Sequence, residues 1–286
     1  MFQYFIYRLA HFIVSHSPLK VGYSIAKFVA TWQYLCSNTD RNIVKKNLKA
    51  IFPEKSDSEI KAITKQVFIN FGKYLADFLR FSKIDKEFIK NKVKIKGLES
   101  IDKVLRQSNG GIIITAHLGN WELAGAIMGV LGYKIIGIVM PHKHKKVSDF
   151  FNKQRQINNM EVCSLGNAAR FCLSGLKQNK MVAVVADRDF TEHGLVTDFL
   201  NKKALLPKGA ASFHLKTQAP IIYAFLTRCK DDTFRFELGQ PPKFNLTGEK
   251  EKDIEIIIKT YITIIEKYIK TYPEQWFMFR KYWIDE

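Results

Sequence analysis

The amino-acid sequence predicts an α/β fold with a largely parallel mixed sheet, flanked by helices and preceded by amphipathic N-terminal helices. Short runs rich in β-branched residues alternate with segments whose apolar residues recur at helical spacing, which is typical of a sheet built from strand–helix units. Residues 111–116 (GIIITA) are the clearest run, because they are largely apolar and lead into a polar loop, as a buried parallel strand does. The chain of 286 residues shows no internal repeat and no linker, which favours one large unit.

Two apolar, aromatic-rich stretches open the chain, at residues 1–14 and 21–37. Arg8 and Lys27 interrupt them, so neither reaches the roughly 18 uncharged apolar residues expected of a membrane-spanning helix. The basic residues are also placed wrongly for a signal peptide, in which positive charge precedes the apolar run. We expect two amphipathic helices that lie on a membrane surface; the alternative is that they only pack on the rest of the chain.

The other elements follow from the same patterns, after a membrane-associating helical segment at residues 1–40 and within a main domain at residues 41–286. Asn120 is a suitable N-cap for the helix that follows the strand at residues 111–116. Helices are predicted wherever apolar residues return at helical spacing: residues 57–81, 121–131, 147–159, 168–176, a segment introduced by Leu205 and Pro207 that runs through Gln218, 254–272, and a short aromatic one at 275–283. Further strands are predicted at short apolar runs: residues 134–140, 161–165, 181–186 and 219–227, with 234–238 as an antiparallel edge strand.

The charge balance restricts the partners of the chain. A net charge of +18 favours an acidic partner, such as nucleic acid, anionic lipid or an acidic carrier protein. No helix-turn-helix, zinc-finger or RNA-recognition signature is present, so we expect no nucleic-acid role. The four cysteines form no CxxC pair, which argues against structural zinc and a disulfide framework and for a reducing compartment.

Candidate catalytic residues come directly after two of the predicted strands, where active sites of parallel α/β sheets lie. His117 follows the strand at residues 111–116, and Glu122 opens the next helix. A tight turn at Gly119 would let His117 fold back toward Glu122, and a carboxylate on one imidazole nitrogen raises the basicity of the other. This pair predicts a general base that takes a proton from an alcohol.

The second strand end carries Asp187, Arg188 and Asp189. An arginine between two acids is either a salt-bridged structural knot or a group held ready for an anion. In the second interpretation Arg188 binds an anionic head group or stabilises a developing oxyanion.

Five blocks in order make the chain resemble the lysophospholipid acyltransferase superfamily, and within it the branch of lipid A late acyltransferases that add lauroyl or myristoyl groups. The stretch TAHLGNWELAG resembles the H-x4-(D/E) motif of the superfamily. The other blocks resemble patterns of the branch from about residue 40 to the C-terminus: Arg41-Asn42, Asn47-Leu48 and Phe52-Pro53; Arg155; Val196, Phe199, Ala204, Pro207 and Gly209 through Pro220; and Tyr272-Pro273-Glu274-Gln275-Trp276.

This resemblance implies direct transfer of an acyl group from a thioester, carried by acyl carrier protein or CoA, to a hydroxyl of a lipid acceptor. Neither a metal nor a cofactor is expected, because a thioester is already activated. His117 would be the general base and Glu122 its partner. We expect substrate contacts from a set of polar residues around them: Asn120, Arg155, Asp187, Arg188 and Lys208.

The resemblance also implies a place and an acceptor. The enzyme would work at the cytoplasmic face of the inner membrane as a peripheral or monotopic protein, on an anionic lipid surface, and a lipid A precursor is the first choice of acceptor. Three departures from the branch put the acceptor in question. Arg188 stands where the branch usually has Gln, and Met140 where it often has Arg. The branch tends to have a His four residues beyond the Trp, where this chain reads Phe277-Met278-Phe279-Arg280.

Three alternatives stay open. The acceptor is a phosphatidylinositol mannoside or a lysophospholipid in the first, and in the second the chain is a non-catalytic lipid-binding protein of the same fold. The third is a metallohydrolase that uses histidines and aspartates from three loops: His117, His142, His144, Asp187 and Asp189. His142 and His144 lie in a lysine-rich loop, which disfavours a bound cation.

Overall fold

The short apolar runs form one mixed sheet in the computed structural model, which describes residues 2–284. Met1, in the predicted segment 1–40, and Asp285 and Glu286, in the predicted domain 41–286, lie outside the described residues. In the described part of the chain, seven strands pair in the order β1-β9-β8-β2-β5-β3-β4. They are β1 (Val93–Lys96), β2 (Gly111–Thr115), β3 (Ile135–Val139), β4 (Met160–Ser164), β5 (Met181–Val185), β8 (Ile221–Arg228) and β9 (Phe234–Leu238). All neighbours are parallel except β8 and β9, so the predicted α/β class with a largely parallel mixed sheet is confirmed.

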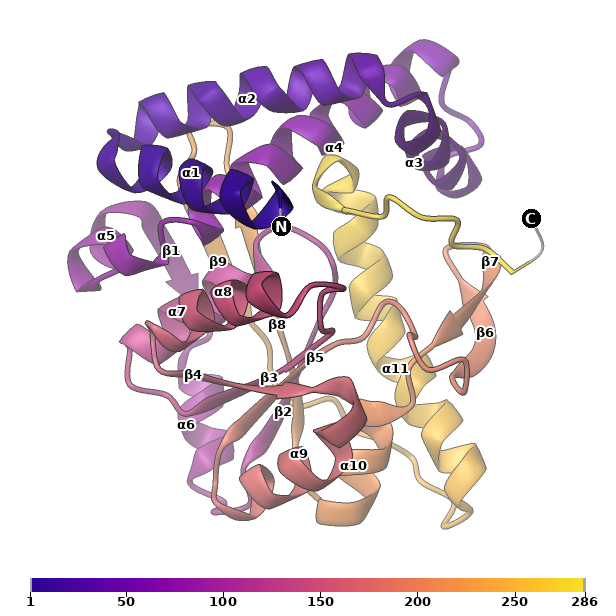
Figure 1. Cartoon of the computed structure of the whole chain (residues 1–286). Coiled ribbons are helices and arrows are strands. Elements are labelled where there is room, and N and C mark those ends of the chain that lie inside the picture. The colour runs from indigo at the N-terminus through magenta and orange to yellow at the C-terminus, as the bar shows by residue number, and fades with distance from the viewer. Residues whose placement is uncertain (1, 285–286) are drawn as a thin grey trace.

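Helices cover both faces of this sheet (Figure 1). In β2 the side chains alternate between two hydrophobic cores, with Ile112 and Ile114 in one and Ile113 in the other. The Ile113 side packs on α5 (Lys86–Lys92), α6 (Glu99–Leu105), α7 (Trp121–Val130) and α8 (Lys145–Gln156). The opposite side packs on α9 (Ala168–Lys177), α10 (Gly209–Thr217) and α11 (Lys250–Thr271). Because both faces are covered, the central strands are apolar throughout, which made them visible in the sequence.

The helices Asn38–Ile51, Lys86–Lys92 and Glu99–Leu105 were not predicted, and three further features differ from the prediction. The antiparallel pairing of β9 with β8 is confirmed, but β9 is not an edge strand, because the unpredicted β1 pairs with its outer side. A hairpin of β6 (Leu195–Phe199) and β7 (Lys202–Leu206) was not predicted; Leu200 and Asn201 both take positive φ, and only Asn201 is a typical residue for such a turn. The predicted helix at residues 275–283 is wrong, since only Pro273–Gln275 form a short 3-10 turn before irregular chain.

The predicted N-terminal helices are present as α1 (Phe2–His16) and α2 (Leu19–Cys36), followed by α3 (Asn38–Ile51) and α4 (Asp57–Phe78). Helix α2 lies along α4, and the two backbones touch, because a Cβ at Gly72 would lie 2.9 Å from the carbonyl oxygen of Ala26. Within residues 2–284, no helix combines the length and the apolar content that crossing a bilayer requires.

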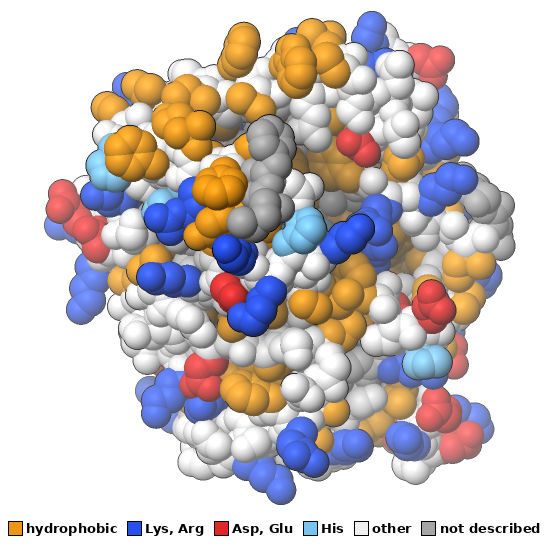
Figure 2. All heavy atoms as spheres, in the orientation of Figure 1, with side chains coloured by type: hydrophobic (Ala, Val, Ile, Leu, Met, Phe, Trp, Pro, Cys, Tyr) orange, Lys and Arg blue, Asp and Glu red, His pale blue; other side chains and the backbone are white. Residues whose placement is uncertain are grey.

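The outer side of α1 and α2 exposes large apolar side chains that no other element covers. Figure 2 shows hydrophobic side chains gathered over the part of the molecule where these two helices lie. We call this surface the apolar face of α1 and α2; its members are Phe5, Ile6, Leu9, Phe12, Ile13, Val21, Ile25, Phe28, Val29, Trp32 and Leu35. Phe28 is 74% exposed and Trp32 is 64% exposed, which is unusual for side chains of this size.

Candidate active site

The register of the sheet brings His117 and Asp187 together. Strands β2 and β5 are parallel neighbours with Thr115 opposite Val185, so the residues that follow each strand also lie side by side. The Nδ1 atom of His117 is 2.8 Å from Oδ1 of Asp187, and the backbone N–H of His117 donates to Oδ2 at 3.1 Å. The carboxylate therefore accepts the Nδ1 proton, which leaves Nε2 as the nitrogen with a free lone pair.

Asp187 is held from several directions. Its side chain is fully buried, and the indole Nε1 of Trp276 donates to Oδ2 at 2.9 Å. Burial by itself raises the pKa of the Asp187 carboxyl, but the charge of the His117 ring and the hydrogen bonds from His117 and Trp276 outweigh it, and the net pKa is below the usual value. Asp187 thus remains ionised at neutral pH and keeps the His117 ring in one orientation.

This pKa shift predicts how stability depends on pH. The pKa is lower in the folded chain than in the unfolded chain, where it is about 3.9. Asp187 therefore stabilises the folded state above that pH, and its contribution is lost as the pH falls through the folded pKa. An aspartate in the unfolded chain titrates near pH 4, roughly its ordinary pKa. Below about this pH, the free energy of unfolding of Asp187→Asn should fall less steeply than that of the wild type. Urea unfolding at a series of pH values measures this; parallel curves would contradict the shift.

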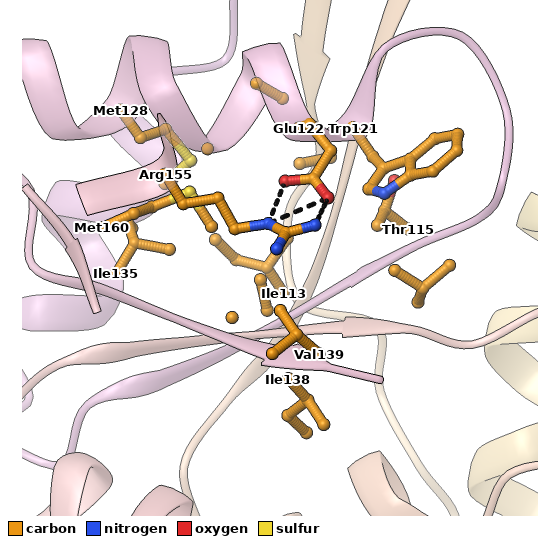
Figure 3. A pocket seen from close by; sticks show the side chains of 16 residues that line it. Ile113, Thr115, Trp121, Glu122, Met128, Ile135, Ile138, Val139, Arg155 and Met160 are labelled. Carbon is orange, nitrogen blue, oxygen red and sulfur yellow. Dashed lines mark hydrogen bonds and ion pairs between the residues drawn. The ribbon is translucent and has the colours of Figure 1, made fainter. Parts of the chain in front are cut away.

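Glu122 does not pair with His117, so that part of the prediction is corrected. Its carboxylate makes a bidentate ion pair with Arg155 of α8: Nε lies 2.8 Å from Oε2, and Nη2 lies 2.5 Å from Oε1 (Figure 3). The physical reason is the direction of the side chains, because Glu122 points from the first turn of α7 toward α8, while His117 points toward β5. The interacting carboxylate is Asp187, which the sequence analysis had placed among the substrate contacts.

The Glu122–Arg155 pair is buried, with side-chain exposures of 9% and 11%. Burial alone lowers the pKa of Arg155, but the charge of Glu122 outweighs it and raises the pKa above the usual value. Arg155 therefore keeps its charge, and its guanidinium lies against the Glu122 carboxylate beside the cleft. Arg155 lines the cleft, but its guanidinium is engaged by a protein carboxylate, and its contact with substrate stays a prediction.

Removing one partner of this pair should be costly. We expect Arg155→Met to lower the free energy of unfolding by about 3–5 kcal/mol, because Glu122 is left buried without a counter-charge. The double variant Glu122→Gln/Arg155→Met should lose much less, since no isolated charge remains. Urea unfolding of the three proteins tests this, and equal losses in the single and the double variant would contradict the role of the unpaired charge.

The loop after β2 has a fixed shape that the sequence anticipated. Gly119 has φ +65°, and a Cβ there would lie 2.1 Å from the carbonyl oxygen of Leu226, so only glycine fits. The C-terminal segment also holds this loop, because Phe277 N–H donates to the carbonyl oxygen of His117 at 2.8 Å and Gly119 N–H donates to that of Gln275 at 2.9 Å. The chain bends at Gly119, but this bend does not bring His117 to Glu122 as predicted.

A cleft of about 780 Å³ opens at this edge of the sheet, under α4. His117 lies in its wall, with Arg188 and Lys208. The guanidinium of Arg188 lies over the ring of Phe190, 4.5 Å from the centroid, and burial together with the nearby charge of Arg280 lowers its pKa. Arg188 and Lys208 therefore place basic side chains in the wall of the cleft that His117 also lines, and binding of an anion by Arg188 stays a prediction.

Two predicted substrate contacts are placed elsewhere. Asn120 is 2% exposed and does not line the cleft: its side-chain oxygen caps α7 at Leu123 N–H, 3.0 Å away, and its amide nitrogen donates to Asp77. Asp187 is fully buried behind His117. The short polar side chains of Asn120 and Asp187 bond to other residues of the protein, so both predicted substrate contacts are corrected.

A narrow apolar slot of about 60 Å³ continues from the cleft between the sheet and α7 (Figure 3). The Glu122–Arg155 pair and Trp121 belong to both spaces, so the slot opens beside them. Most of its other walls are apolar side chains: Ile113, Ala124, Met128, Ile135, Ile138, Met160, Ala183 and Ala224. Such a space suits the hydrocarbon part of a ligand.

Trp276 was not predicted as the partner of Asp187, although it ends the PEQW block that carries part of the family resemblance. The ligand set of the metallohydrolase alternative does not assemble, because within residues 2–284 no three His, Cys, Asp or Glu side chains converge as metal ligands would.

Known proteins share this sequence pattern. The family described as bacterial lipid A biosynthesis acyltransferase matches residues 1–284. A phosphatidylinositol mannoside acyltransferase of Mycobacterium tuberculosis is 22% identical over 221 residues, 75% of this chain and 68% of its own length. A lipid A biosynthesis acyltransferase of Haemophilus influenzae is 19% identical over 92% of this chain and 82% of its own length. A lipid A biosynthesis palmitoleoyltransferase of Escherichia coli is 24% identical over 54% of this chain and 49% of its own length.

The family match covers all but the last two residues of the chain. The chain therefore belongs to the bacterial lipid A biosynthesis acyltransferase family, and acyl transfer to a lipid is the activity that this membership supports.

Proposed function

We propose that this protein transfers a fatty acyl group from a thioester to a hydroxyl of a lipid acceptor, with His117 as general base. The observation that carries the proposal is the His117–Asp187 pair, which stands in the wall of a large cleft beside an apolar slot. The pair supplies a base, the cleft has room for a lipid head group, and the slot accepts hydrocarbon.

The reaction can be written for these groups. Nε2 of His117 takes the hydroxyl proton, and the acceptor oxygen attacks the thioester carbonyl carbon. The C–S bond of the resulting tetrahedral intermediate then breaks, and the leaving thiolate receives the proton from His117. An ester and a free thiol are the products. Asp187 keeps the ring oriented and stabilises its positive charge between the two proton transfers.

Arg188 and Lys208 are proposed to bind anionic groups of the substrates. Both line the cleft, and the ion pair found for Lys208 among residues 2–284 is a long contact of 3.7 Å to the exposed Glu251. Candidate anions are the phosphates of the acceptor head group and those of the donor, which we propose is acyl carrier protein or acyl-CoA. No cofactor beyond the thioester is proposed, and the net charge of +18 favours an acidic carrier protein as a partner.

A lipid A precursor is the acceptor that we propose first, because the matching family carries that description. A phosphatidylinositol mannoside is the second candidate, favoured by the name of the M. tuberculosis relative. Mass spectrometry of total lipids from cells with the gene, without it, and with His117→Gln separates them. Loss of one acyl chain from a single lipid class in both mutants identifies the acceptor; an unchanged lipid profile would favour a non-catalytic lipid-binding protein.

We propose that residues 1–40 bind the cytoplasmic face of the inner membrane as a peripheral or monotopic anchor, with residues 41–286 as the catalytic domain. The apolar face of α1 and α2 supports this, together with the basic charge of the chain, which is attracted to anionic lipid. Such a surface would hold the enzyme where its lipid acceptor resides.

The anchor predicts a specific binding defect. Phe28→Ser/Trp32→Ser should weaken binding to anionic vesicles by about 10²-fold, because two large apolar side chains no longer enter the lipid. Raised salt should weaken wild-type binding without abolishing it, since screening leaves the apolar contact. Vesicle flotation measures both effects. Phe171→Ser/Leu246→Ser, two exposed apolar residues outside the apolar face, is the matched control, and equal defects in the two variants would contradict the assignment.

A further inference from the structure

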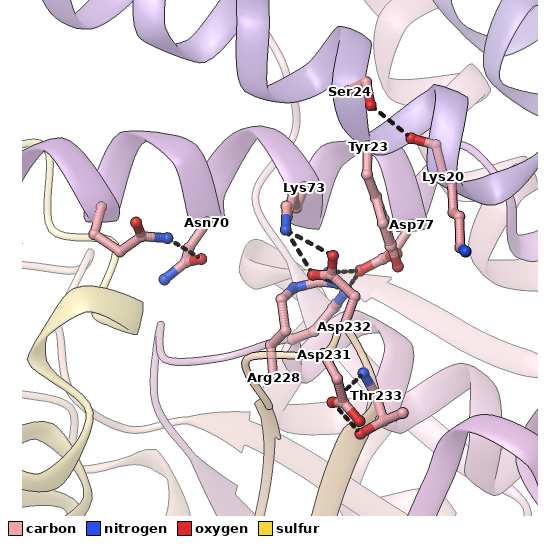
Figure 4. A network of polar contacts seen from close by, with 12 residues as sticks. Lys20, Tyr23, Ser24, Asn70, Lys73, Asp77, Arg228, Asp231, Asp232 and Thr233 are labelled. Atoms are coloured by element: carbon pink, nitrogen blue, oxygen red, sulfur yellow. Dashed lines mark hydrogen bonds and ion pairs between the residues drawn. The ribbon is translucent and has the colours of Figure 1, made fainter.

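A buried carboxylate, Asp77 of α4, joins three parts of the chain that are far apart in sequence (Figure 4). Asp77 is 3% exposed. Its Oδ1 accepts a hydrogen bond from the hydroxyl of Tyr23 at 2.5 Å, and its Oδ2 accepts from the side-chain amide of Asn120 at 2.7 Å and from the guanidinium of Arg228. These donors come from α2, from the loop after β2 and from β8, so the Asp77 carboxylate connects these three parts of the chain.

Through Asn120, Asp77 is connected to the loop that carries His117. Asn120 lies between His117 and Glu122 and has no spare polar group: its side-chain oxygen caps α7, its amide donates to Asp77, and its backbone N–H donates to Leu226 at 2.8 Å. A shift of Asn120 would therefore move the start of α7 and the loop that carries His117.

Through Tyr23, Asp77 is connected to α2, the helix that carries part of the apolar face of α1 and α2. Tyr23 is 5% exposed on the inner side of α2, and the guanidinium of Arg228 lies 4.7 Å from the centroid of its ring. Phe28 and Trp32 project from the outer side of the same helix. Since α2 and α4 touch at Gly72, a displacement of α2 by a bound surface is transmitted to α4 and to the Tyr23–Asp77 hydrogen bond.

A buried ion pair with polar partners is not needed for stability alone, because apolar residues of the same volume often stabilise as well. We propose that Asp77 is a positioning residue, and that through Tyr23 and Asn120 it couples the apolar face of α2 to the loop carrying His117. Lipid bound to α2 then steadies the active-site loop, and the enzyme is most ordered at the membrane that holds its acceptor. The inference rests on the membrane surface proposed above.

Hydrogen–deuterium exchange of residues 117–126 in the full chain tests the coupling without any acyl donor or acceptor. The probe is vesicles of equal parts phosphatidylethanolamine and phosphatidylglycerol. In the wild type, vesicles should slow exchange over this segment by about ten-fold, the factor that one hydrogen bond to a charged group is worth. In Tyr23→Phe, which removes only the hydroxyl, binding to the vesicles should persist while the slowing at residues 117–126 disappears.

Two further variants separate coupling from general damage. Asn120→Ser keeps an N-cap for α7 but loses the donor to Asp77, so it should also lose the slowing. Tyr268→Phe is the control: it also removes a tyrosine hydroxyl that donates to a carboxylate, Glu237 at 2.7 Å, but on the side of the sheet that faces α11. This variant should keep the slowing of exchange. Slowing that persists in Tyr23→Phe, or its absence in the wild type on bound vesicles, would overturn the proposal. Failure of the chain to bind vesicles overturns it too, whereas a chain that couples but transfers no acyl group contradicts the proposed reaction alone.

Discussion

Replacing His117 by Gln is expected to lower the rate of acyl transfer by about 10²- to 10⁴-fold, the usual contribution of a positioned general base. Glutamine preserves the size and a hydrogen bond to Asp187, but it has no lone pair basic enough to take the acceptor proton. The fold should be unchanged, because the His117 side chain stands in the wall of the open cleft and its ring contacts with Trp121 and Phe190 are edge to face.

The measurement is thiol release from an acyl thioester in the presence of a lipid extract, together with circular dichroism to check folding. His144→Gln is the matched control, since His144 is exposed and does not line the cleft. A folded His117→Gln variant with wild-type turnover would place the base elsewhere.

Asp187→Asn is expected to have an effect of similar size, about 10²- to 10⁴-fold on turnover. An amide nitrogen in place of one carboxylate oxygen donates where Nδ1–H of His117 now donates. The ring would then change tautomer or orientation, and Nε2 would no longer be the free base. The substitution also removes the negative charge that stabilises protonated His117 between the two proton transfers.

Glu122→Gln is the informative comparison for Asp187→Asn. The structure pairs Glu122 with Arg155, and the amide of glutamine can still accept from that guanidinium, so we expect a smaller loss of turnover and an unshifted pH profile. If instead Glu122→Gln lost all activity while Asp187→Asn retained it, the carboxylate that serves His117 during the reaction would be Glu122.

The sequence predicted the fold class well because its central strands are buried on both faces. The run GIIITA and the run at residues 181–186 are nearly all apolar, and this pattern needs no knowledge of the partners. Strand β1 was not predicted because its run, VKIK, has only four residues, and at the edge of the sheet it lacks the continuous apolar pattern of the central strands. The hairpin of β6 and β7 stands apart from the main sheet, and its pairing is local, so the strand–helix pattern gave no sign of it.

His117 was predicted at the correct strand end, but its partner was not. Spacing along the chain favoured Glu122, which is near in sequence, whereas the pairing of β2 with β5 brings Asp187 to the ring. Strand order cannot be read from one sequence, although the position of both residues directly after buried strands was a usable signal. Asn120 shows the same limit, since the residue recognised as an N-cap was also assigned to substrate, and its second bond, to Asp77, depends on where α4 packs.

The most direct test of the central claim is transfer by the purified chain of a radiolabelled acyl group, offered as acyl-CoA and separately on acyl carrier protein, to a total lipid extract. We expect label to appear in one lipid class as an alkali-labile ester, to be absent with His117→Gln, and to be much reduced with Asp187→Asn. Failure of the wild-type chain to label any lipid from either donor, or equal labelling by His117→Gln, would contradict acyl transfer through this histidine.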